Sequence, residues 1–471
     1  MAKSKQSIIG RGMKGVFHAP LERAFDKILT PFEEFIHRQT TSSMLLMGTA
    51  AVALIIANGP WAAAYAHIMH APVGISIGSW SLNMSLHHWI NDGLMAMFFF
   101  IVGLELKREV LVGELADLRN AALPIGAAIG GMVVPAMVYF LFNPDGEAAL
   151  GWGIPMATDI AFAIGALALL ASRVPKALIT FLVALAIVDD LGAVLVIAVF
   201  YTDSIALGPL FVAIGLFALM LAFNLVGIRK PLPYFIVSLV FWYAVLLSGV
   251  HATLAGVLGA LCVPTNPKYE PERFSILVKG LMKRFDKSYQ TGEGILVNDD
   301  LRAVVQSLEN GVQSVQAPLQ RLEHAWHMPV AYIVIPIFAL ANAGIPLEIA
   351  SMGETLNHQV FIGVSLGLIL GKFIGITGVS WLMLKLGLAV LPKDTRFTQI
   401  AGVSLLAGIG FTMSIFVAQL GFNGRDDLLL IAKTAILLTS LIAGVAGILW
   451  LYLVSTPDPV DPGPVDNDDN E

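Results

Sequence analysis

The sequence predicts an all-α polytopic membrane protein, and three observations lead to this fold class. Hydrophobic residues make up 56% of the 471 positions and charged residues only 13%, about half the charged share of soluble domains. Long apolar runs recur along the chain, and Lys and Arg gather in alternate loops. A bilayer is the natural solvent for such a chain, because a soluble domain cannot hide so much apolar surface.

Spanning helices are expected wherever roughly 20 mainly apolar residues follow one another. That rule predicts about twelve spans, near 42–58, 88–106, 121–143, 151–172, 177–201, 206–227, 231–247, 249–265, 328–346, 360–384, 398–420 and 428–454. Spans one to eight thus occupy 42–265, and spans nine to twelve occupy 321–454. The first span follows a polar, basic segment and is expected to remain as an anchor.

Loop charge predicts the orientation of these spans. The loops 58–86, 144–149, 202–208 and 347–357 contain no Lys or Arg, whereas most other loops are basic. Basic loops stay in the cytoplasm, so both termini are expected there.

Other segments are expected to lie outside the membrane core. Residues 1–41 form a cytoplasmic N-terminal segment, 266–320 a polar cytoplasmic insert, and 455–471 a disordered acidic tail rich in Pro and Asp. Within residues 70–86, apolar and polar residues alternate around Gly78 and Ser79, which predicts a short exposed hairpin. An irregular loop fits this segment equally well. The single cysteine, Cys262, excludes an internal disulfide, and the chain has no basic patch suited to nucleic acid.

Three predicted spans carry ionisable residues near one depth. Asp189 and Asp190 lie in the middle of 177–201, Lys372 is at the centre of 360–384, and Thr158 and Asp159 lie well inside 151–172. Charges in hydrocarbon are costly and usually functional. If the three aspartates and the lysine all ionise, the group keeps a net charge of −2, which protons or a bound cation must neutralise.

The adjacent aspartates suggest how this neutralisation works. Neighbours on a helix point about 100° apart, so one aspartate can pair with Lys372 while the other faces a watery approach. Close carboxylates titrate as a group, and oxygen ligands also suit a hard cation such as Na⁺ or Li⁺. Competition between protons and a metal cation at Asp190 and Asp189 would exchange the two. No cofactor is expected.

Two predicted spans look interrupted. The fourth holds Pro155 close to Asp159, and the eleventh holds Gly402, Gly408 and Gly410. Small-residue helix packing is an alternative explanation for the glycines. Interrupted helices at matching places in two halves nevertheless indicate a midplane transporter site, where Asp159 would balance positive helix ends and Lys372 negative ones.

Several motifs closely resemble the bacterial NhaA sodium/proton antiporters, from about residue 40 to 454. They are NDGLMAMFFFIVGLELKRE (91–109), MATDIAFAIGALALL (156–170), ALAIVDDLGAVLVIAVFYT (184–202), SGVHATLAGV (248–257), ANAGI (341–345) and GIGFTMSIF (408–416). Inverted repeats are known from that same family, so the argument from matching halves is not independent of the resemblance.

The resemblance implies a twelve-helix fold with inverted three-helix repeats and crossed, discontinuous fourth and eleventh helices. It implies a secondary active transporter, not an enzyme, in the bacterial inner membrane. Its activity would be pH-regulated electrogenic exchange of two protons for one Na⁺ or Li⁺, serving sodium and pH homeostasis. A homodimer joined through the 70–86 hairpin is also implied.

Site residues carry over by motif. Asp190 resembles the main cation-binding carboxylate, Asp189 its neighbour, Lys372 the membrane lysine paired with the first aspartate, and Thr158 with Asp159 the pair at the unwound fourth helix. Residues matching the family's pH-response groups are Glu105, Arg108, His251, Glu323, His324 and His327. A simple helix salt bridge explains Glu105 and Arg108 equally well, and His251 is also explained as an ordinary helical histidine. The insert is longer than the family's loop, the acidic tail is extra, and Gln320 precedes Arg321 where a second basic residue is expected.

Two other functions need the same kinds of residue. A Na⁺-coupled symporter of organic anions would also use broken helices, with a wider polar cavity. An intramembrane aspartyl protease would use Asp159 with Asp189 or Asp190. Lys372 in the same layer and the absence of a Gly-x-Gly-Asp run argue against the protease.

Overall fold

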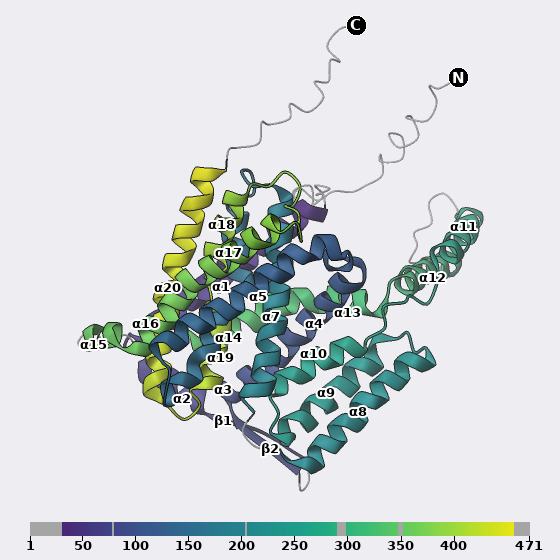
Figure 1. Cartoon of the computed structure of the whole chain (residues 1–471). Coiled ribbons are helices and arrows are strands. Elements are labelled where there is room, and N and C mark those ends of the chain that lie inside the picture. The colour runs from purple at the N-terminus through teal and green to yellow at the C-terminus, as the bar shows by residue number, and fades with distance from the viewer. Residues whose placement is uncertain (1–30, 78–79, 203–204, 290–297, 347–351, 456–471) are drawn as a thin grey trace.

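The computed structural model describes residues 31–77, 80–202, 205–289, 298–346 and 352–455, and these fold into a bundle of long helices with one hairpin (Figure 1). The helices of the first half are α1 (Pro31–Ala57), α2 (Ala62–His70), α3 (Leu86–His88), α4 (Met95–Val112), α5 (Leu118–Phe142), α6 (Ile160–Ala168), α7 (Lys176–Phe200), α8 (Leu207–Val226), α9 (Pro231–Ser248) and α10 (Ala252–Cys262). Those of the second half are α13 (Pro318–Pro329), α14 (Ile335–Asn342), α15 (Met352–Asn357), α16 (Gln359–Leu366), α17 (Lys372–Lys385), α18 (Phe397–Leu406), α19 (Phe411–Gly421) and α20 (Asp426–Val454).

Short helical segments of different pitch join several of these helices. The wider π-helical segments are η2 (Trp89–Leu94), η5 (Val330–Val334) and η6 (Gly367–Gly371), and the tighter 3₁₀ segments are η3 (Glu114–Ala116) and η4 (Glu147–Met156). Segments of this kind often mark functional places in membrane and soluble helices. Here η6 ends immediately before Lys372, and η4 ends at Met156, one residue away from the Thr158–Asp159 pair.

The helices are those of a multi-pass membrane protein. Within the described ranges, nine helices are long and apolar enough to cross a bilayer, or ten if α18 and α19 count as one bent span. All twelve predicted runs lie on helices. Two of these helices are not among those long and apolar enough to cross a bilayer. In the run 249–265, α10 has only 11 residues, and in the run 88–106, which lies on η2 and α4, the charged residue Glu105 is included. The all-α membrane fold is confirmed, and the count of twelve spans stays a prediction.

The hairpin expected at 70–86 is present. Strands β1 (Pro72–Ile77) and β2 (Trp80–Ser85) pair antiparallel, with Pro72 opposite Ser85. Trp89 anchors the pair by donating its indole N–H to the Val73 carbonyl at 2.9 Å. The hairpin lies at one end of the bundle, while α1 begins and α20 ends at the other (Figure 1).

The polar insert contains two helices that stand apart from the bundle. They are α11 (Pro271–Ser288) and α12 (Asp299–Val315), which pack against each other away from the hairpin (Figure 1). Most of the predicted N-terminal segment, residues 1–30, and most of the acidic tail, 456–471, lie outside the described residues.

Glycines allow α4 and α10 to pack closely at the centre of the bundle. A Cβ added to Gly256 would lie 2.2 Å from the Ala96 carbonyl oxygen, and one added to Gly103 would lie 2.8 Å from the Cβ of Ala260. Small residues at helix contacts let backbones approach in this way. The packing of α10 on α4 therefore depends on the absence of side chains at both positions.

We expect Gly256→Val to destabilise the bundle, because the added carbons meet the backbone of α4 and overpacking costs about 1–3 kcal/mol. The matched control is Gly215→Val on α8, where an added Cβ meets nothing within 4 Å. Thermal unfolding of both variants in detergent measures the difference. Equal melting temperatures for the two variants would contradict the close packing of α4 on α10.

Candidate functional site

Two broken helices meet inside the bundle. The first break, residues 157–159, separates η4 from α6, and the second separates α18 from α19, which are bent by 51°. Pro155 stands inside η4 just before the first break. Gly408 lies at the second, where an added Cβ would come within 2.5 Å of the Leu368 carbonyl oxygen. Proline and glycine thus interrupt both helices, as their places in the sequence predict.

The two breaks bond to each other. The Asp159 backbone N–H donates to the Ile409 carbonyl at 2.7 Å, and the Thr158 hydroxyl donates to the Ala407 carbonyl at 3.0 Å. Backbone groups freed by a break have no water to bond within hydrocarbon and must find partners in the protein. Each break therefore supplies partners that the other one needs.

Asp159 lies where two helices begin. Its Oδ1 accepts from the Phe162 N–H at 3.1 Å and so caps the start of α6. Its Oδ2 accepts from the Thr412 N–H at 2.9 Å, at the start of α19, and from the Thr412 hydroxyl. The positive ends of two helix dipoles thus point at one carboxylate, which is the balance that the sequence predicted for Asp159.

Lys372 is completely buried and is held by three oxygens. Its ammonium lies 2.7 Å from Asp189 Oδ2 and 2.9 Å from the Thr158 hydroxyl, and it also donates to the Met156 carbonyl. Met156 is the last residue of η4, so the ammonium sits at the negative end of that helix. The resemblance implies that the membrane lysine pairs with the first of the two adjacent aspartates, and Lys372 indeed contacts Asp189.

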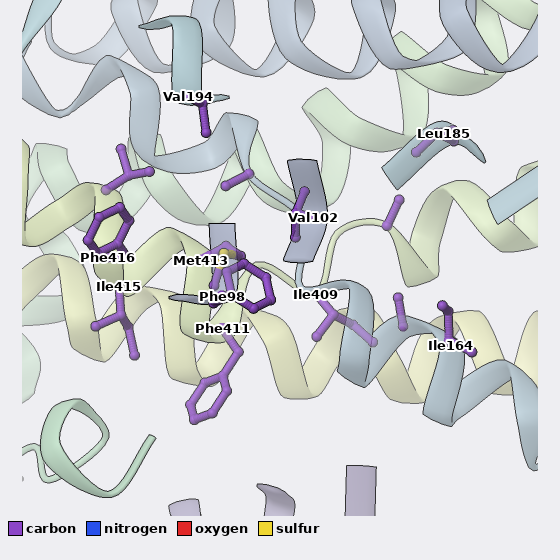
Figure 2. Close-up of a cluster of buried hydrophobic side chains, with 14 of the residues drawn as sticks. Phe98, Val102, Ile164, Leu185, Val194, Ile409, Phe411, Met413, Ile415 and Phe416 are labelled. Carbon is purple, nitrogen blue, oxygen red and sulfur yellow. The ribbon is translucent and has the colours of Figure 1, made fainter. Parts of the chain in front are cut away.

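Asp190 is buried beside this pair without such partners. Its Oδ2, like Asp189 Oδ1, has no hydrogen-bond partner among the described residues. Apolar side chains surround the layer: on α7, Leu185 and Val194 flank the two aspartates one turn away, and Ile409 and Phe411 lie at the second break (Figure 2). Unpartnered carboxylate oxygens in such surroundings need a proton or a cation.

The arrangement offers oxygen atoms to a small hard cation. In the described part of the chain no three His, Cys, Asp or Glu side chains converge as metal ligands. Asp189 and Asp190 would therefore need help from neutral oxygens, such as carbonyls, or from water to hold a metal cation.

A second group of charges joins α4 to α13. Arg108 pairs with Glu323 at 2.5 Å and with Glu109 at 2.9 Å, while Glu105 Oε1 lies 3.9 Å from His327 Nε2. Among the described residues, Glu105 and Arg108 do not form the salt bridge with each other that was the alternative explanation for them. Glu105 and His327 also line a small cavity of about 60 Å³ that reaches Ile160, the residue after Asp159.

The remaining predicted pH-response residues lie elsewhere. His324 is exposed to solvent on α13. His251 precedes α10, and its Nε2 lies 2.5 Å from the Tyr201 carbonyl oxygen. It lines a different and larger cavity of about 710 Å³, together with His87 and Asp92. The structure thus separates His251 from the Glu105–Glu323 group.

Three residues that line the same cavity, His87, Asn91 and Gln419, belong to a polar network that the sequence interpretation missed. The Asn342 amide donates to Asn91 at 2.8 Å, the Asn91 amide donates to Gln419 at 2.9 Å, and His87 Nε2 lies 3.0 Å from Asn342 Oδ1. Asn91 and Asn342 stand in motifs that carry the resemblance. A lone amide in an apolar run is a weak signal, however, and only its partners reveal a network.

Comparisons with known proteins agree with one another. The family model described as Na⁺/H⁺ antiporter 1 matches residues 33–451. The Na⁺/H⁺ antiporter NhaA 1 of Saccharophagus degradans is 56% identical over 92% of this chain and 93% of its own length. The NhaA antiporters of Sulfurimonas denitrificans and Acidithiobacillus ferrooxidans are 49% and 50% identical, over 93% and 91% of this chain and 98% of their own lengths.

We expect Lys372→Met to lower stability strongly, because Asp189 would lose its buried counter-charge; breaking such a pair typically costs about 3–5 kcal/mol. Adding Asp189→Asn should restore much of the loss, since the neutral pair leaves no uncompensated charge. Thermal unfolding of both single variants and the double variant closes a double-mutant cycle. Additive losses would show that the contact carries no coupling energy.

Proposed function

The chain belongs to the Na⁺/H⁺ antiporter family, and from this premise we propose that it exports Na⁺ or Li⁺ in electrogenic exchange for two protons per cation. The observation that carries the proposal is the pair of buried, unpartnered oxygens Asp189 Oδ1 and Asp190 Oδ2 beside two broken helices. Such oxygens can hold a proton or a metal cation, but not both in the same place. Sodium homeostasis and pH homeostasis are the corresponding cellular roles.

Asp190 is the proposed carrier of the exchanged ion. Its carboxylate is uncompensated, whereas Asp189 shares Lys372 as its counter-charge. Asp159 and Thr158 hold the broken backbone that surrounds the site, and neutral oxygens there complete the cation's ligands. Replacing two protons by one Na⁺ moves one net charge per cycle, so the exchange is electrogenic. The titration belongs to the whole group of charges.

Two cavities come close to the broken helices, and neither is lined by Asp189 or Asp190. The cavity at Glu105 and His327 reaches α6 one residue beyond Asp159. The larger one, on the hairpin side, reaches Phe416 of α19. We propose that ions enter the site alternately through these cavities, with the cation leaving on the hairpin side. That side faces outward if the basic loops and both termini lie in the cytoplasm, in the bacterial inner membrane.

The pH response is assigned to the charges between α4 and α13. Arg108 pairs with Glu323 between these helices, and Glu105 lies 3.9 Å from His327, a contact that is an ion pair only while the histidine is protonated. Protonating Glu323 would break the first pair. His324 and His251 stay predictions by resemblance. The β1–β2 hairpin is the proposed contact of a homodimer.

The alternative activities lack this support. Relatives that match over nine-tenths of the chain are named antiporters, which fits a transporter and not a protease. The organic-anion symporter needs a solute site, and the buried carboxylates favour a cation instead.

We expect added Na⁺ or Li⁺ to dissipate an imposed pH gradient in everted vesicles, and Asp190→Asn to abolish this response, because the ion loses its carboxylate. Asp189→Asn should impair it severely. Asp300→Asn, on the exposed surface of α12, is the matched control and should retain full activity. The rate in the parent protein should respond to an imposed membrane potential.

An Asp190→Asn protein that is correctly inserted and fully active would overturn the site assignment. An exchange rate that does not depend on the membrane potential would still be consistent with Na⁺/H⁺ exchange, but it would contradict the exchange of two protons for one cation. Insertion is checked by the amount and monodispersity of purified protein.

We expect Glu323→Gln to flatten the pH dependence of exchange, because the variant holds position 323 neutral at every pH and removes the Arg108 pair. The maximal rate should fall less than tenfold, since Glu323 lies outside the Asp189–Asp190 site. Rates of Na⁺-induced proton flux from pH 6 to pH 9 measure this. Gln306→Glu on exposed α12 serves as a charge-change control, and an unaltered profile for Glu323→Gln would remove Glu323 from the pH response.

A further inference from the structure

Helix α11 carries a basic stripe that the exchange does not use. The helix has five basic and two acidic side chains, a net charge of +3. Lys279, Lys283 and Lys287 follow at intervals of four, with Ile276 three residues earlier, so these residues share one face. All four are exposed, and Ile276 is 71% exposed. We call these four residues the α11 stripe.

The opposite face of α11 is occupied by α12. Leu281 of α11 is buried, as are Leu301 and Val304 of α12. A Cβ added to Gly311 of α12 would lie 3.2 Å from Leu277. The α11 stripe therefore points away from its partner helix, and none of its lysines enters an ion pair among the described residues.

The insert is anchored where α10 ends. The Leu319 N–H donates to the Pro264 carbonyl at 3.1 Å, and the Tyr269 N–H donates to the Ser314 carbonyl at 3.1 Å. These bonds close the base of the insert between Cys262, the last residue of α10, and Pro318, the first of α13. Both are helices of the membrane bundle, so α11 starts next to the bilayer surface.

We propose that α11 docks on anionic phospholipid headgroups of the adjacent leaflet through the α11 stripe. A basic amphipathic helix with an exposed apolar residue binds the headgroup boundary by charge and by burial together. The lysines would contact lipid phosphates, and Ile276 would enter the boundary layer. This proposal concerns the insert alone and stands independently of the exchange site.

The acidic C-terminal tail is a less suitable occupant. Residues 456–471 contain six acidic residues and no basic ones, which complements the lysines but offers little apolar surface to Ile276. Moreover, α20 ends across the width of the bundle from α11, although both lie away from the hairpin (Figure 1). The bilayer supplies both negative charge and an apolar boundary beside the insert.

Docking is tested in the full chain with a fluorophore next to the stripe. In a Cys262→Ala background, Gly280→Cys gives an exposed attachment point where an added Cβ meets nothing within 4 Å. The labelled protein is placed in nanodiscs of phosphatidylglycerol or of phosphatidylcholine, each doped with a headgroup-nitroxide lipid. We expect strong quenching in phosphatidylglycerol and little in phosphatidylcholine, with release at 1 M salt, where charges more than about 3 Å apart are screened.

The triple variant Lys279→Gln/Lys283→Gln/Lys287→Gln should lose the quenching. Each lysine near an anionic surface contributes enough that three should shift the docking equilibrium on the order of 100-fold. The control Lys268→Gln/Arg302→Gln/Arg321→Gln removes the same charge from the insert and from the start of α13, away from the stripe, and should stay quenched. Retained Na⁺/H⁺ exchange in the triple variant reports that it is folded.

Equal quenching in both lipids, or quenching that survives in the triple variant, would overturn docking through headgroup charge. Absence of quenching in phosphatidylglycerol would show that α11 does not touch the bilayer. A change in label emission on deleting 456–471, without any lipid dependence, would assign the stripe to the acidic tail instead and likewise overturn the proposal.

Discussion

Lys372 is completely buried, and the arrangement of the interior depends on giving its ammonium partners. Its three oxygen partners come from two other segments, α7 and the break after η4. Since an unpaired charge there is far more costly than a paired one, α7, α17 and the first break must be positioned together. The π-helical segment η6, which ends one residue before Lys372, lies at this junction.

The second constraint is the backbone itself. A helix cannot stop inside a bilayer unless its free N–H and C=O groups find partners. Here the two breaks form hydrogen bonds with each other: the Asp159 N–H donates to the Ile409 carbonyl, and the Asp159 carboxylate accepts from the Thr412 N–H. If only one helix were broken, its free N–H and C=O groups would lack partners. The pairing of the two breaks therefore explains why charge, proline and glycine occur together at one depth.

The exchange site and the insert lie in different parts of the molecule. The family match covers residues 33–451, so it contains the buried charges, the broken helices and the insert. The described part of the insert, with α11 and α12, stands outside the bundle and is joined to it at its base. A segment at this place can have surface properties of its own without disturbing the packing around Asp189.

The sequence by itself determined the membrane fold and the depth of the charges. Apolar runs of bilayer length have one stable conformation in lipid, and a helix rises about 1.5 Å per residue, so position in a run gives depth. It also indicated the hairpin and the broken helices, through the alternation in 70–86 and through Pro155 and Gly408, but an irregular loop and plain helix packing fitted the same residues. Motifs in the same order along the chain carried the family.

Only the tertiary structure decided which side chains meet. Helix geometry allowed either aspartate to pair with Lys372, and the contact of Asp189 depends on how α7 and α17 are rotated toward each other. For the same reason, Arg108 reaches Glu323 on a distant helix and not Glu105 on its own, and Asn91 finds Asn342 251 residues away. The length and polarity of a run set its depth in the membrane, but its rotation and neighbours follow from packing across the whole chain.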